Sequence, residues 1–90
     1  MRFRAEYERL SGTNRALFML AVRQLVEDFR AGRKPRPSLR VKRVQDFPGV
    51  WELSWAADGR ATFEYGPELI DGQPHITWRR IGSHDIFRNG

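Results

Sequence analysis

Apolar side chains between residues 11 and 31 recur at spacings of three and four, the period of an α-helix with one buried face. The apolar stripe consists of Leu17, Phe18, Leu20, Ala21, Leu25 and Phe29. Ser11 or Thr13 can cap the start of this helix, because a side-chain oxygen there accepts a free backbone N–H of the first turn. Gly32 stands just past the predicted end, where a left-handed closing residue favours glycine. Residues 3–10 alternate like a strand but also fit a helical face, and we favour a short helix.

After the helix, the period of the pattern changes to two, as in β-strands. Residues 33–38 contain two prolines, which remove backbone donors and exclude a helix. Residues 39–43 are predicted to form a short strand or an extended loop with cations on one side. Alternation over residues 50–56, 60–65 and 75–81 predicts three strands, with a hairpin turn at Asp58-Gly59 and a loop bracketed by Gly66-Pro67 and Asp71-Gly72. Their inward side chains are Trp51, Leu53, Trp55, Ala61, Phe63, Tyr65, Ile76 and Trp78.

One face of this sheet is apolar and must be covered, and the long helix can cover it. The sequence therefore predicts an α+β fold, a two-layer sandwich in which N-terminal helices pack on a three- to four-stranded antiparallel sheet. Ninety residues fit a single domain over residues 1–90. The other sheet face is predicted to be polar and open to solvent. Its side chains are Glu52, Ser54, Arg60, Thr62, Glu64, His75, Thr77 and Arg79.

Composition narrows the chemistry that such a domain could carry. The sequence has no cysteine, which excludes disulfides and thiolate metal sites, and two histidines alone cannot form a structural zinc site. We therefore expect neither a metal nor a cofactor. No apolar run approaches the roughly 20 residues that span a bilayer, and the N-terminus lacks the apolar segment of a secretory signal. A cytoplasmic protein is the expectation.

Positive charge is concentrated in the first half of the chain. The formal net charge is +5; residues 1–45 hold twelve Lys or Arg against four Asp or Glu, whereas residues 46–90 hold four against seven. Arginine makes up fourteen of the sixteen basic residues, and its planar guanidinium suits bidentate contacts with phosphate. This balance indicates a nucleic acid or an acidic protein as partner, although a solvated surface would give the same composition.

Histidine and arginine in the second half supply the residue types needed to cut RNA without a metal. His84 follows a glycine break after Arg79 and Arg80, and Arg60 begins its strand directly after a hairpin turn. A histidine can move a proton near neutral pH, an arginine can stabilise charge on the phosphate, and RNA supplies its own 2′-hydroxyl nucleophile. The plainer alternatives are a structural or solvated His84 and an Arg60 that pairs with a neighbouring glutamate.

Three motifs lie in the strand region. They are Val50-Trp51-Glu52-Leu53, Asp58-Gly59-Arg60-Ala61-Thr62-Phe63-Glu64-Tyr65 and Trp78-Arg79-Arg80-Ile81-Gly82-Ser83-His84-Asp85-Ile86-Phe87. Together they resemble the RelE/ParE toxin superfamily, and the closing Gly-Ser-His is similar to the Gly-Thr-His ending of its YafQ-like branch. Basic residues 39–43 resemble the segment that follows that family's helical hairpin, so the resemblance covers about residues 12–87.

The resemblance implies the toxin of a type II toxin–antitoxin system. Such a toxin is a ribosome-dependent, metal-independent mRNA endonuclease that inhibits translation and is held inactive by a cognate acidic antitoxin. The catalytic positions that the resemblance matches are His84 for proton transfer, Arg80 and Arg60 for phosphate contact, Asp58 as an acidic residue and Phe87 for stacking beside the cleaved base. RNA binding is expected from Arg40, Lys42, Arg43 and Arg79. Strict alternation turns Arg80 toward the core and Arg79 outward, so either Gly82 bends the strand or Arg79 contacts the phosphate.

Two departures from the family pattern keep other functions open. Ser54 stands where the branch often has a second histidine, and the family's opening strand is expected to be absent here or reduced to residues 3–7. One alternative is a ParE-like toxin that inhibits DNA gyrase and needs no C-terminal histidine. The other is a non-enzymatic basic module that binds an acidic protein partner.

Overall fold

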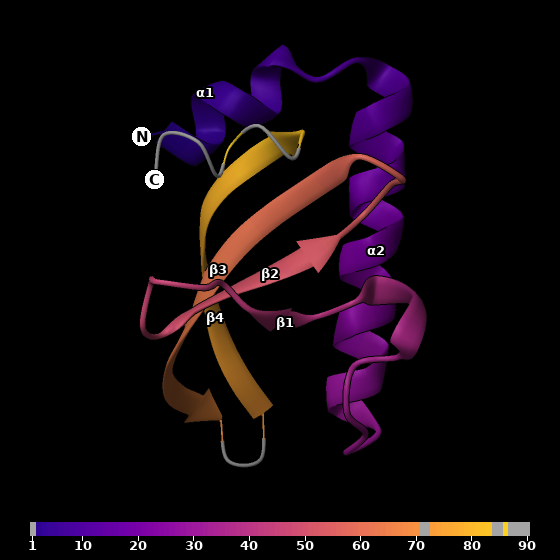
Figure 1. Cartoon of the computed structure of the whole chain (residues 1–90). Coiled ribbons are helices and arrows are strands. Elements are labelled where there is room, and N and C mark those ends of the chain that lie inside the picture. The colour runs from indigo at the N-terminus through magenta and orange to yellow at the C-terminus, as the bar shows by residue number, and fades with distance from the viewer. Residues whose placement is uncertain (1, 71–72, 84–85, 87–90) are drawn as a thin grey trace.

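The computed structural model describes residues 2–70, 73–83 and 86. In this part of the chain, helices come first and a sheet of strands follows (Figure 1). The elements are α1 (Arg2–Arg9), α2 (Gly12–Arg30), the 3-10 helix η1 (Pro37–Leu39), β1 (Lys42–Arg43), β2 (Val50–Ser54), β3 (Gly59–Ile70) and β4 (Gln73–Ser83). Neighbouring strands pair antiparallel in the order β1-β2-β3-β4. The predicted α+β architecture, with N-terminal helices on a four-stranded antiparallel sheet, is confirmed.

Helix α2 begins and ends at the residues that its capping signals predict. The Ser11 hydroxyl accepts a hydrogen bond from the Asn14 backbone N–H at 3.1 Å, so Ser11 rather than Thr13 is the cap. Gly32 has a φ of +69°, and its N–H donates to the Phe29 carbonyl at 3.1 Å. Glycine adopts this left-handed ending without steric cost. No helix in the described part of the chain is long and apolar enough to cross a membrane.

The ambiguous segment before α2 is helical, as favoured from the sequence. Phe3 and Tyr7 lie one turn apart on α1, which places both rings on the same side of the helix. The ring of Phe3 lies 5.9 Å from those of Phe18 and Trp78, and the ring of Tyr7 lies 6.0 Å from that of Phe18. Helix α1 thus packs aromatic rings against α2 and β4, and the described residues before α2 contain no strand.

The core lies between α2 and the sheet. Its buried side chains are Phe18, Ala21, Leu25, Leu39, Leu53, Trp55, Ala61, Phe63 and Ile81. Leu17 and Leu20, which the apolar period assigns to the core, are 39% and 47% exposed, so that prediction is wrong. Both line a cleft beside η1 and the β2–β3 hairpin. The helical period predicts which side of the helix is apolar, but it does not predict how much of that side the sheet covers. Tyr65, also predicted to point inward, packs against Trp51 and Phe63 but remains half-exposed.

The outer face of the sheet is only partly open. Val44, Val50 and Ile86 are buried on it and gather around the buried Thr62. Residues 44–50 fold back on themselves, and the Val44 N–H donates to the Val50 carbonyl at 2.9 Å. The prediction of an open polar face is therefore wrong around Thr62. Val50 begins β2, but Val44 and Ile86 lie outside the strands, where no period predicts burial.

A β-bulge in β4 decides which way its arginines face. The register between β3 and β4 shifts between Thr62 and Phe63, so Arg79 is an extra residue in the ladder. Beyond the bulge, Arg80 pairs with Thr62 on the outer face and Ile81 is buried in the core. Strict alternation, which turns Arg80 toward the core, fails here because the bulge adds one residue to the strand.

Candidate nucleic-acid interface

A cleft of about 470 Å³ opens between the connector that follows α2 and the outer face of the sheet. Its basic lining residues are Arg36, Arg40, Lys42 and Arg60, and its other polar lining residues are Glu52 and Ser54; we call this site the cationic cleft. Arg40 and Lys42 come from the connector and β1, whereas Arg60 comes from the start of β3. Three of the basic residues predicted to contact phosphate therefore share one site.

Strand pairing dictates this convergence. Lys42 pairs with Glu52, and Ser54 pairs with Arg60, and residues opposite one another in a ladder project to the same face of the sheet. Arg40 closes η1 with a φ of 48°, in the left-handed region, and so turns the chain into β1. The basic residues of the connector are thereby brought beside Arg60.

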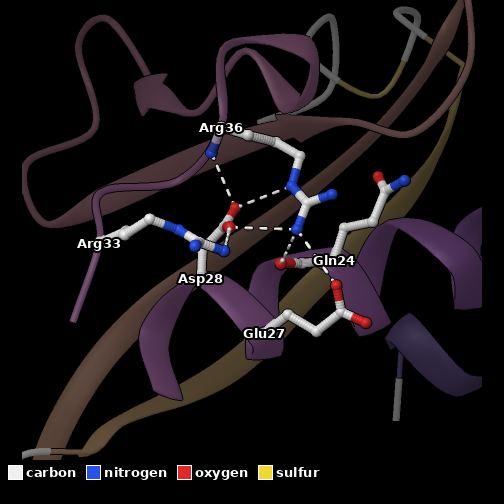
Figure 2. A network of polar contacts seen from close by, with 5 residues as sticks. All are labelled: Gln24, Glu27, Asp28, Arg33 and Arg36. Atoms are coloured by element: carbon white, nitrogen blue, oxygen red, sulfur yellow. Dashed lines mark hydrogen bonds and ion pairs between the residues drawn. The ribbon is translucent and has the colours of Figure 1, made fainter. Parts of the chain in front are cut away.

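A buried carboxylate anchors the connector to α2 (Figure 2). Asp28, near the end of α2, is 2% exposed and accepts hydrogen bonds from the Arg36 backbone N–H at 2.9 Å and from its Nε at 3.0 Å. The other carboxylate oxygen accepts from Nη2 of Arg33 and of Arg36, each at 3.1 Å. The Arg36 side chain holds the pKa of the Asp28 carboxyl well below its usual range, although burial acts in the opposite direction.

Arg36 is consequently a structural cation. Its Nη2 also donates to the Gln24 carbonyl and to the Glu27 carboxylate, both at 3.2 Å, and its bonds to Asp28 raise the pKa of the guanidinium. Arg36 fixes the wall of the cationic cleft and adds little charge for a ligand. Sequence reasoning missed this network, although an aspartate three residues after Leu25 in an apolar stripe was a usable signal.

The charge available to a ligand comes from Arg40, Lys42 and Arg60. No carboxylate among the described residues lies within ion-pair distance of Arg40 or Arg60. Lys42 Nζ lies 3.8 Å from Oε1 of the buried Glu52, which offsets part of its charge. Apart from Arg36, whose charge is offset by Asp28 and Glu27, the cleft holds three cations against one carboxylate, an arrangement that suits a phosphodiester.

The β2–β3 hairpin holds Arg60 in place. Arg60 Nη1 donates to the carbonyl oxygens of Ala56, Ala57 and Gly59 at 3.2, 3.3 and 2.9 Å. Gly59 lies directly against the indole of Trp55, where an added Cβ would come within 2.5 Å of the ring. The glycine before Arg60 is therefore required by close packing, and the tight turn orients the guanidinium that follows it.

The other predicted site residues lie apart from the cationic cleft or outside the described residues. Arg43 lies opposite Trp51 in the β1–β2 ladder, so its side chain is on the other side of the sheet from Lys42. Its guanidinium lies 5.3 Å from the centroid of the Trp51 ring. Asp58 is exposed in the β2–β3 turn. His84 and Phe87 both lie outside the described residues.

The two arginines of β4 have carboxylate partners of their own. Arg79 Nε lies 3.8 Å from Glu64 Oε2 on the exposed part of the outer face. Arg80 Nη2 lies 2.7 Å from Glu6 Oε2, and both side chains are largely buried. Neither residue lines the cationic cleft.

A cleft of about 400 Å³ with a mixed polar and apolar lining adjoins the cationic cleft and lies between α2, η1 and the β2–β3 hairpin. We call it the apolar groove; its apolar lining comprises Leu17, Leu20, Ala21, Leu39, Trp55, Ala56 and Ala57. Arg40 and Arg60 line both clefts. Occupation of one cleft would therefore affect the charges that the other presents.

No protein-family model, no curated protein and no solved structure matches the chain. Within the part of the chain that the structure describes, no three His, Cys, Asp or Glu side chains are grouped so that they could hold a metal ion.

Proposed function

We propose that the chain is the toxin of a type II toxin–antitoxin system, a RelE-like, ribosome-dependent endonuclease that cuts mRNA in the cytoplasm without a metal. The observation that carries this proposal is the cationic cleft, in which Arg40, Lys42 and Arg60 converge on one face of the sheet. A site with three cations and one carboxylate favours the repeated phosphates of a single RNA strand.

In this proposal, Arg60 stabilises the negative charge that develops on the cleaved phosphate. The hairpin carbonyls fix its guanidinium before RNA binds, which reduces the reorganisation needed in the transition state. Strand β4 ends at Ser83, which pairs with Gly59, the residue before Arg60. His84, the proposed proton-transferring group, follows Ser83 in the sequence. The attacking nucleophile is the 2′-hydroxyl of the RNA itself.

The proposed partner that silences the toxin is an acidic antitoxin segment that inserts apolar side chains into the apolar groove. Two observations support this occupant: Leu17 and Leu20 are exposed there, and Arg40 and Arg60 border the groove with positive charge. Carboxylates at that border would pair with the same guanidinium groups that RNA phosphates need. Antitoxin and RNA would therefore exclude one another.

The proposal is tested by primer extension on mRNA in translating ribosomes supplied with the purified protein. The wild-type protein is expected to cut ribosome-bound message and to leave the same naked RNA intact. Arg60→Gln is expected to lower the cleavage rate by about 10²- to 10³-fold, because it removes charge stabilisation of the phosphate. Arg23→Gln, a change at an exposed arginine of α2, is the matched control and should keep full activity.

Absence of cleavage by the wild-type protein would contradict the proposal. If the protein then inhibits supercoiling by DNA gyrase, the ParE-like alternative replaces it. If it does neither and only binds an acidic protein, it is a non-enzymatic binding module.

A further inference from the structure

A second ionic network lies at the junction of α1, β4 and the chain that follows β4. Arg80 donates from Nε and Nη2 to the Glu6 carboxylate, with distances to Oε2 of 3.2 and 2.7 Å. The side chains of Arg80 and Glu6 are only 14% and 15% exposed. Glu6 Oε1 also accepts a hydrogen bond from the Ile81 backbone N–H at 3.2 Å. Helix α1 is thereby fastened to β4 at the place where the bulge turns Arg80 outward.

The remaining contact of this network reaches beyond the strand. Arg80 Nη1 donates to the Ile86 carbonyl at 2.9 Å. The Ile86 side chain is buried, and an added Cβ at Gly82 would come within 2.8 Å of its Cγ2. Val44 and Val50 are buried on the same face of the sheet. Ile86 is therefore held by a charged hydrogen bond, by close packing on a glycine and by apolar neighbours.

We propose that Arg80 is a positioning residue, which fixes the chain at Ile86 through its pairing with Glu6, and that it does not bind the RNA phosphate. This inference rests on the proposed function, because Ile86 lies two residues after His84 in the sequence. A phosphate at Arg80 would have to displace the Glu6 carboxylate from a largely buried pair, and that would leave a buried charge without a partner. Arg40 and Arg60, which have no carboxylate partner among the described residues, meet no such competition.

A positioning residue and a phosphate ligand differ in what their loss changes. Loss of a phosphate contact weakens RNA binding and reduces the dependence of affinity on salt. Loss of a positioning contact slows cleavage while affinity and its salt dependence stay the same. Glu6 cannot bind phosphate itself, so it should behave like Arg80 only if the two residues act together.

The test compares Arg80→Met, Glu6→Gln and the double variant with Arg23→Gln, a change at an exposed arginine of α2, as control. Each protein is measured for single-turnover cleavage of ribosome-bound mRNA, for binding to a single-stranded RNA over a range of KCl, and for the ¹³C-methyl NMR shifts of Ile86. Arg80→Met and Glu6→Gln should each slow cleavage at least 10-fold, and the double variant should be no slower than the worse single one. Affinity and salt slope should be unchanged, and the Ile86 methyl signals should move.

A different pattern would overturn the inference. If Arg80→Met lowers the magnitude of the salt slope by about 0.7 while Glu6→Gln has no effect, Arg80 contacts phosphate. If the wild-type protein cuts no message, the proposed function fails, but the methyl signals still test the inference: unchanged Ile86 shifts in both variants would refute it. Should Arg80→Met fail to fold, Arg80→Lys keeps the charge but cannot bridge Glu6 and Ile86 as a fork, and it should give an intermediate loss of cleavage.

Discussion

Neutralising the cationic cleft should reduce the salt dependence of RNA binding by an amount that follows from its geometry. Arg40, Lys42 and Arg60 face one site, and each cation that neutralises a phosphate of single-stranded RNA contributes about −0.7 to the slope of log affinity against log salt. Three contacts give a slope of about −2, so a rise from about 50 to about 200 mM KCl should weaken wild-type binding about 20-fold. Lys42 is expected to contribute least, because Glu52 lies 3.8 Å away.

The assay is fluorescence anisotropy with a labelled single-stranded RNA at several KCl concentrations. The triple variant Arg40→Gln, Lys42→Gln, Arg60→Gln should bind weakly and show almost no salt dependence. Arg43→Gln is the matched control, because Arg43 follows Lys42 directly but stacks on Trp51 instead of facing the cleft. A triple variant with the wild-type slope, or a control that loses as much slope as Arg40→Gln, would refute the assignment of RNA binding to this cleft.

Three further predictions concern stability and partner binding. Folding lowers the pKa of the Asp28 carboxyl, so its contribution to stability is complete above the ordinary pKa of about 3.9 and is lost as the pH falls toward the folded pKa. Asp28→Asn should therefore lower the urea midpoint at pH 7 and reduce the loss of stability that the wild-type protein shows in acid. Gly59→Ala should destabilise the protein by about 1–3 kcal/mol in urea unfolding, because its Cβ meets the buried Trp55 ring, whereas Gly12→Ala, with nothing nearby, should be tolerated. Leu20→Glu should leave the thermal unfolding midpoint unchanged and abolish binding of the proposed acidic antitoxin in a co-expression pull-down; retained binding would exclude the apolar groove as its site.

Local signals in the sequence account for most of the fold. Ser11 and Gly32 mark the ends of α2 because capping depends on residues close in sequence. Alternation locates the strands for the same reason. The loop predicted to begin at Gly66-Pro67 is wrong, because β3 continues through these residues to Ile70 and β4 begins at Gln73. Leu17 and Leu20 were assigned wrongly because their exposure depends on where η1 and the hairpin end, which no local pattern contains.

The candidate site was less predictable because it depends on tertiary pairing. The sequence identified Arg40 and Arg60 separately, but their shared cleft results from the β2–β3 register and from the connector held by Asp28. The orientation of Arg80 depends on a bulge at Arg79, and a bulge changes every later position of a strand without a signal in its alternation. The ion pair between Arg80 and Glu6 joins residues far apart in the sequence, so neither segment alone predicts it.

The most direct test of the central claim is to map the ends of mRNA fragments produced on ribosomes by the wild-type protein and by His84→Gln. Attack by the RNA's own 2′-hydroxyl predicts fragments with 2′,3′-cyclic phosphate and 5′-hydroxyl ends from the wild-type protein. His84→Gln should bind ribosomes equally well and cut about 10²- to 10⁴-fold more slowly, the usual effect of losing a positioned acid or base. Full-rate cleavage by His84→Gln, or no cleavage by the wild-type protein, would contradict a nuclease that depends on this histidine.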